Sequence, residues 1–93
     1  MTARLTINDF APQLGKDFSV DTGDSSCTLR LVEVTPAAEA PEGGGWVPFS
    51  LVFDGPAEPL LPQATYRLED PDGRPMDVFL VPIATARYEA VFG

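Results

Sequence analysis

Apolar and polar residues alternate with a period of two from Asp17 onward, which is the pattern of half-buried β-strands. The 93 residues include 10 prolines and 8 glycines, which break the chain into segments too short for helices of ordinary length. No connection is long enough for a parallel crossover. We therefore predict an all-β fold, a small antiparallel six-stranded barrel or tight sandwich with one short N-terminal helix, with strands at residues 17–21, 27–35, 48–54, 63–69, 76–81 and 87–92.

The longest predicted strand, residues 27–35, changes the face that its apolar residues occupy. Every second residue from Cys27 to Leu31 is apolar, but the series then shifts by one position to Val32 and Val34. A one-residue shift of this kind indicates a β-bulge, which moves the later side chains to the opposite face. Bulges are common where a sheet curls into a small barrel, so the pattern agrees with that architecture.

The predicted helix covers residues 8–14. Thr6 and Asp9 have the spacing of a capping box, with Asp in place of the usual Glu or Gln. We expect one or two turns, in which Phe10 and Leu14 lie on one face and close one end of the core.

Proline and glycine mark where the later strands turn or end. Residues 70–73, Asp-Pro-Asp-Gly, are typical of a type I turn that joins two antiparallel strands. Pro82 is expected to end the strand that begins at Met76. Residues 36–45 are Pro, Ala, Glu and Gly, and we predict that they form a mobile loop within a single β domain spanning residues 1–93.

Charge and composition restrict the chemistry. Lys and Arg number 6 against 14 Asp and Glu, a formal net charge of −8, so we expect no nucleic-acid partner. The chain has no histidine, hence no imidazole base and no histidine-based metal site. Its single cysteine, Cys27, cannot form an internal disulfide, which favours a reducing cytoplasm. No stretch is apolar and long enough to span a membrane as a helix, and we expect neither a membrane nor a cofactor.

Acidic residues suggest two further possibilities. Asp70, Asp72 and Asp77 could gather near one hairpin end and hold a calcium ion, but solvated turn carboxylates are the simpler explanation. A hydrolase would need two facing carboxylates, one with a raised pKa. The acidic candidates lie in the middle of predicted strands, and arginines occupy similar positions. Cross-strand ion pairs are therefore a simpler explanation for these carboxylates than catalysis. The acidic residues are Glu33, Glu69, Asp77 and Glu89, and the arginines are Arg30, Arg67 and Arg87.

A group of apolar residues falls on the face opposite the predicted core. Trp46, Phe79, Val81 and Val91 are left over once the inward positions have been assigned. An exposed apolar strip of this kind favours contact with another chain. The alternative is a second small core beneath the helix or the long loop, and the sequence supports both interpretations about equally.

Several motifs together span nearly the whole chain: Phe10, Leu14-Gly15 and Phe18 near the start, then residues 48–53 (PFSLVF), 55–56 (GP), 61–63 (LPQ), 65–69 (TYRLE), 79–82 (FLVP) and 88–92 (YEAVF). With these motifs the chain resembles a family of small bacterial proteins, about as long as this one, classed as a domain of unknown function. The resemblance implies an all-β fold and genes that sometimes lie near phage-tail-type components. It supplies no catalytic or binding residues.

We therefore expect a non-enzymatic structural or protein-interaction module, with a protein partner or self-association and with a link to a phage-tail-like assembly. Contact would use strand addition or packing of the apolar strip. One alternative is a small-ligand-binding barrel with a pocket at its mouth near Trp46, Tyr66 and Tyr88. A second alternative is a minor hydrolase that uses the acidic residues.

Overall fold

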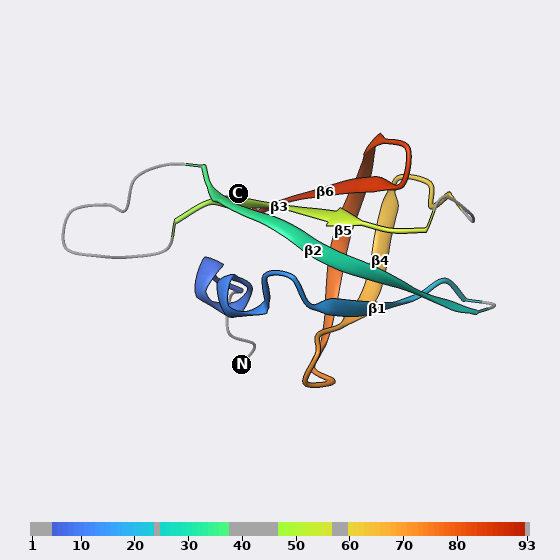
Figure 1. Cartoon of the computed structure of the whole chain (residues 1–93), viewed down its shortest axis with the longest axis horizontal. Helices are drawn as coiled ribbons and strands as arrows, with labels where there is room; N and C mark the ends of the chain where they lie inside the picture. The colour runs from blue at the N-terminus through green and yellow to red at the C-terminus, as the bar shows by residue number, and fades with distance from the viewer. Residues whose placement is uncertain (1–4, 24, 38–46, 57–59, 93) are drawn as a thin grey trace.

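A computed structural model describes residues 5–23, 25–37, 47–56 and 60–92. Two short 3-10 turns, η1 (Ile7–Asp9) and η2 (Ala11–Gln13), precede the strands. Six strands follow (Figure 1): β1 (Asp17–Asp21), β2 (Ser26–Pro36), β3 (Phe49–Asp54), β4 (Ala64–Glu69), β5 (Pro75–Ala84) and β6 (Arg87–Phe92).

The strands form a closed antiparallel barrel in the order β1-β2-β3-β6-β5-β4. Two three-stranded meanders, β1-β2-β3 and β4-β5-β6, are joined by the β3–β6 pair and by the β1–β4 pair. Figure 1 shows β4 and β5 running at a steep angle to β1 and β2, as the curl of a small barrel requires. The predicted all-β barrel with one short helical segment is confirmed.

The middle strand of each meander carries a bulge. In β2 the pairing with β3 shifts between Leu31 and Glu33, so Val32 is the extra residue and the predicted bulge is confirmed. A second register shift lies in β5 between Pro82 and Ala84, where the prediction that Pro82 ends the strand is wrong. The pairing of β5 with β4 stops at Leu80, and proline is tolerated at such strand margins and bulges because no ladder hydrogen bond is lost there.

Inward residues of all six strands form one apolar core. The predicted alternation holds: in β1 and in β3 every second side chain is fully buried. Burial of each large apolar side chain contributes about 1.5–3 kcal/mol. The fully or almost fully buried set is Phe10, Phe18, Val20, Leu29, Leu31, Phe49, Leu51, Phe53, Leu61, Leu68, Met76, Val78, Leu80, Tyr88 and Ala90.

Phe10 packs the N-terminal segment against this core, but the prediction that Leu14 also closes the core is wrong. The Phe10 ring lies 5.7 Å from the ring of Phe49 and 5.5 Å from that of Phe92, and it is fully buried. Leu14 is 53% exposed. The segment is not one helix, because a new 3-10 turn with Pro12 near its start begins after Phe10, and Leu14 itself has extended backbone angles. The two side chains therefore do not share a helix face.

The predicted loop over residues 36–45 begins one residue later than expected. Pro36 is the last residue of β2 and pairs with Phe49. Residues 38–45 and Trp46 lie outside the described residues.

Candidate functional site

One cross-strand row on the outside of the barrel alternates acidic and apolar side chains. Glu33 of β2 pairs with Val52 of β3, Val52 pairs with Glu89 of β6, and Glu89 pairs with Val81 of β5. We call these four residues the acidic row. All four point outward, because residues next to them in sequence face the core.

Val52 is only 8% exposed although it points away from the core. Directly opposed residues in an antiparallel sheet have Cβ atoms about 4.5–5.5 Å apart, so the side chains on either side of Val52 are within reach of it. Those two neighbours are glutamates, whose aliphatic stems can cover a valine while their carboxylates stay in water. The row therefore combines apolar surface with two negative charges.

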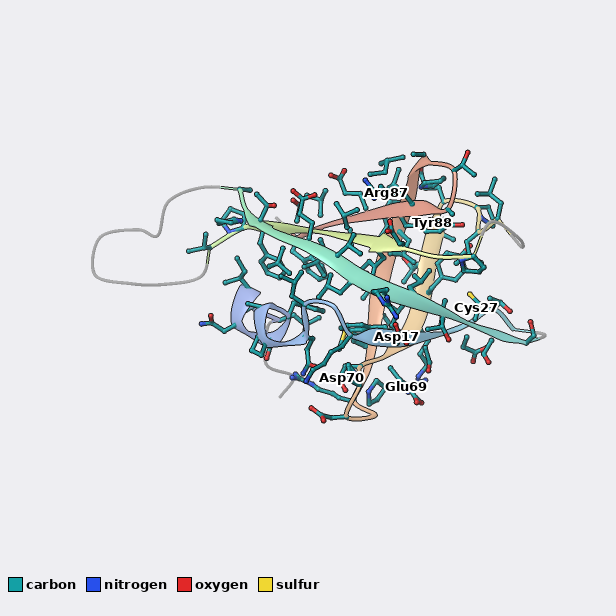
Figure 2. The ribbon with its side chains drawn as sticks, in the orientation of Figure 1. Asp17, Cys27, Glu69, Asp70, Arg87 and Tyr88 are labelled. Carbon is teal, nitrogen blue, oxygen red and sulfur yellow. The ribbon has the colours of Figure 1, made fainter. Side chains whose placement is uncertain are left out.

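The neighbouring row carries balanced charge. Asp17, Arg30, Asp54 and Arg87 follow one another across β1, β2, β3 and β6. Arg30 donates to Asp17 at 3.2 Å and Arg87 donates to Asp54 at 2.9 Å, and Asp17 and Arg87 are labelled in Figure 2. The hydrogen bond to Asp54 raises the pKa of Arg87 above its ordinary value, with smaller contributions from the charges of Asp54 and Glu33. Cross-strand ion pairs thus occur as expected, but their carboxylates come from Asp17 and Asp54.

Three of the four apolar residues predicted for partner binding, Phe79, Val81 and Val91, lie on the outer face. The fourth, Trp46, lies outside the described residues. Phe79 is 48% exposed, Val91 is 65% exposed and Val81 is partly exposed. The structure brings Val81 next to the acidic row, whereas Phe79 pairs with Thr65 and Val91 pairs with Ser50. The β5–β6 ladder has Val81 and Glu89 as its last pair, so no pairing joins Phe79 to Val91.

Ile83 also belongs to this group, although the sequence does not predict it. Ile83 is 48% exposed and lies in β5 two residues after Val81. The predicted strand ends at Pro82 and therefore excludes Ile83. Extending the period of two from Phe79 past this proline would include Ile83. We call Phe79, Val81, Ile83 and Val91 the β5–β6 face.

The closed barrel changes how such a face could be used. Each described strand pairs with a neighbour on both sides, including β1 with β4. Strand addition requires a row of unpaired backbone groups along a free edge. The closed order therefore favours side-chain packing on the outer face, while contact by strand addition stays a prediction.

Both tyrosines named for the predicted ligand pocket bond to the segment before β4, and Trp46, the third residue named for it, lies outside the described residues. The Tyr88 hydroxyl is buried and accepts a hydrogen bond of 2.8 Å from the backbone N–H of Leu61, whose side chain joins the core. The Tyr66 hydroxyl donates to the carbonyl of Pro62 at 2.6 Å. Desolvation is the main cause that raises the pKa of Tyr66. Both hydroxyls therefore hold the segment before β4 in place (Tyr88 is labelled in Figure 2).

The carboxylate of Asp70 is used within its turn. Its Oδ1 accepts backbone hydrogen bonds from Asp72 at 2.9 Å and from Arg74 at 2.8 Å, and Gly73 adopts a φ of +86° that suits glycine. The predicted turn at residues 70–73 is present, with the N–H of Gly73 donating to the carbonyl of Asp70 (Asp70 is labelled in Figure 2). Among the described residues, no three His, Cys, Asp or Glu side chains are grouped so as to hold a metal ion.

Cys27 and the remaining acidic candidates are placed separately. Cys27 is half-buried and packs against the core, and this burial raises the pKa of its thiol. Asp77 lies opposite Arg67, and Glu69 lies opposite Ser19. A half-open polar hollow of about 470 Å³ lies beside the β1–β4 seam, and its lining consists of Ser19, Val20, Asp21, Ser26, Arg67 and Glu69.

Comparison with known proteins places the chain in a family. A family described as a domain of unknown function (DUF6916) matches residues 5–92. No curated protein and no solved structure matches the chain. Within the described residues, no helix has the length and apolar character needed to cross a bilayer.

Proposed function

The chain belongs to the DUF6916 family of domains of unknown function, and we propose that it is a non-enzymatic module that binds a protein partner by packing the β5–β6 face against it. The observation that carries this proposal is the exposure of large apolar side chains on two adjacent strands. Exposed apolar side chains gathered on neighbouring strands favour association with another protein.

The interior of the barrel supports the same proposal. The buried side chains in the described part of the chain are apolar apart from the Tyr88 hydroxyl, which is bonded to the backbone. The core is therefore used for packing, and the side chains available for recognition lie on the outside. A rigid barrel can present an outward face without the entropy cost of ordering a loop.

A pull-down with matched variants tests this function. The Phe79→Ser/Val91→Ser protein removes two exposed apolar side chains and should keep its fold, since both point outward. The Leu14→Ser protein removes an apolar side chain of similar exposure from the N-terminal segment, outside β5 and β6, and serves as the control. Partners captured from a host lysate would be identified by mass spectrometry, purified and titrated against all three proteins by calorimetry.

We expect a purified partner to bind the wild type and the control with equal affinity. It should bind the Phe79→Ser/Val91→Ser protein at least about tenfold more weakly, since two interface anchors worth about 1 kcal/mol or more each together exceed the roughly 1.4 kcal/mol of a tenfold change. If every purified partner binds all three proteins with equal affinity, the proposal is overturned.

The phage-tail-like assembly and the cytoplasmic location are further parts of this proposal. They rest on the resemblance of the motifs and on the single cysteine, respectively. Genes for tail components beside homologous genes in several genomes would support the first. A fusion protein that is found outside the cytoplasm would contradict the second.

A further inference from the structure

The surface next to the β5–β6 face carries negative charge that no ion pair within the described residues neutralises. Glu33 and Glu89 lie on either side of Val52 in the acidic row, and Glu89 is paired with Val81 of the β5–β6 face. Neither glutamate forms an ion pair with any described residue. Glu33 accepts a hydrogen bond from the Thr35 hydroxyl at 3.4 Å, which leaves its charge in place.

The described cations of the protein are engaged or placed elsewhere. Arg87 lies in the neighbouring row, where Asp54 binds it at 2.9 Å, and Glu33 attracts it only through a smaller electrostatic interaction without an ion pair. Arg30 binds Asp17 and Arg74 binds Asp9. The remaining described cations, Lys16 and Arg67, lie outside β3, β5 and β6.

We propose that the partner contacts this surface with a segment in which apolar side chains are flanked by Lys or Arg. This inference rests on the proposed function and adds the chemistry of the partner. The apolar side chains cover the β5–β6 face, and the cations reach Glu33 and Glu89. Complementary charge of this kind speeds encounter and selects the partner more than it adds affinity.

The same arrangement disfavours a second copy of this chain as the occupant. A two-fold interface places the same patch on both partners, so the four glutamates of the two copies would lie in one interface. Each copy also carries a formal net charge of −8, which adds long-range repulsion.

Peptide selection tests the inference before the partner is identified. A phage-displayed library of short random peptides would be selected on the immobilised wild-type protein at low salt. Enriched peptides would be synthesised and titrated against the wild type, against Phe79→Ser/Val91→Ser and against Glu33→Gln/Glu89→Gln.

A charge-matched control completes the set. Glu69→Gln/Asp72→Asn also removes two exposed carboxylates, but from the end of β4 and the turn that follows it. Glu69 pairs with Ser19 of β1 and Pro75 of β5, away from the acidic row, and the Asp70 carboxylate keeps its turn bonds. The control therefore changes the net charge equally without changing the proposed contact surface.

We expect the peptides to combine apolar residues with Lys or Arg and to lose binding to the Phe79→Ser/Val91→Ser protein. Loss of both glutamates should weaken binding about three- to tenfold, the range for two exposed charge pairs, while the Glu69→Gln/Asp72→Asn control should change it less than about twofold. Raising the salt concentration from about 0.05 to about 0.5 M should reduce the difference, because exposed charges are screened.

Three other results would overturn part of the scheme in distinguishable ways. Peptides that need Phe79 and Val91 but lack Lys and Arg, and bind Glu33→Gln/Glu89→Gln normally, would contradict the cationic partner and leave the face intact. Peptides that bind Phe79→Ser/Val91→Ser normally would contradict the proposed function itself. A dimer in light scattering that is lost in Phe79→Ser/Val91→Ser would identify a second copy as the occupant and overturn the inference.

Discussion

The buried hydroxyl of Tyr88 accepts a hydrogen bond of 2.8 Å from the backbone N–H of Leu61, 27 residues earlier in the chain. This bond fixes the residues just before β4 against the core, which includes the side chain of Leu61. Leu61 lies three residues before β4, so the bond holds the start of the β4-β5-β6 meander against β6 of the same meander.

Removal of the Tyr88 hydroxyl should be costly. In Tyr88→Phe the N–H of Leu61 remains buried without its acceptor, which costs about 1–3 kcal/mol of unfolding free energy. The matched variant Tyr66→Phe loses a bond to the exposed carbonyl of Pro62, where water can replace the hydroxyl, and should lose less than about 0.5 kcal/mol. Urea unfolding followed by circular dichroism measures both, and equal losses would argue against the role assigned to Tyr88.

Substitution of Phe10 should reduce the stability far more than substitution of Leu14, although both residues belong to the N-terminal segment. Phe10 is fully buried among aromatic rings, so Phe10→Ala should cost about 3–5 kcal/mol. Leu14 is largely exposed, so Leu14→Ala should change stability by less than about 0.5 kcal/mol. Thermal or urea unfolding of the two variants checks the difference, and a large loss in Leu14→Ala would show that both side chains close the core after all.

Gly55 lies where a side chain would meet the core. A Cβ atom at this position would be 2.5 Å from Leu29 Cδ2 and 3.2 Å from Tyr88 Cε2, and both side chains are fully buried. Gly55→Ala should therefore destabilise the protein by about 1–3 kcal/mol. The double variant with Leu29→Ala relieves the overlap, so in a double-mutant cycle its loss should be smaller than the sum of the two single losses. Additive losses would mean that the contact with Leu29 is not the cause.

Asp9 should make stability depend on pH in acid. Its carboxylate accepts a bond of 2.7 Å from the Thr6 backbone N–H and one of 3.3 Å from Arg74, and the Thr6 bond is the largest cause that lowers its pKa below the ordinary value of 3.8. Because the folded-state pKa is the lower one, this stabilisation is complete above the unfolded-state pKa and is lost as the pH falls through the folded-state pKa.

Asp9→Asn should accordingly be less stable than the wild type by about 0.5–2 kcal/mol at about pH 6–7. The difference should shrink as the pH falls below about 4. Urea unfolding of both proteins between neutral pH and strong acid measures it, and Asp72→Asn is the control for the loss of one negative charge. A difference that stays constant into strong acid would contradict the assignment to the Asp9 carboxylate.

Local patterns are sufficient to predict most of the individual elements. The slip from Leu31 to Val32 indicates the β-bulge, and Asp70 with Gly73 indicates the turn, because each depends on residues adjacent in sequence. The same local rules fail at Pro82 and at Leu14. Whether a strand can contain a proline depends on the strand beside it, and whether a leucine is buried depends on where the helical turn ends.

The candidate site is predictable only in part, for the same reason. The period of two places Phe79, Val81 and Val91 on the outer face, but it cannot show that Val81 is joined through Glu89 to Val52. That juxtaposition depends on the registers of β3 against β6 and of β6 against β5. Both registers are set by pairing between whole strands, and no run of neighbouring residues encodes the β3–β6 pair.

The sequence by itself determined which strand residues face the core and where the turn at residues 70–73 lies, since alternation and turn chemistry act over a few residues. Tertiary structure alone decided that β4 returns to β1 and closes the barrel, that Tyr88 holds Leu61, and that two glutamates border an apolar face. These arrangements arise from pairing between distant strands, where many registers satisfy the same alternation and only the packing of the whole core selects one.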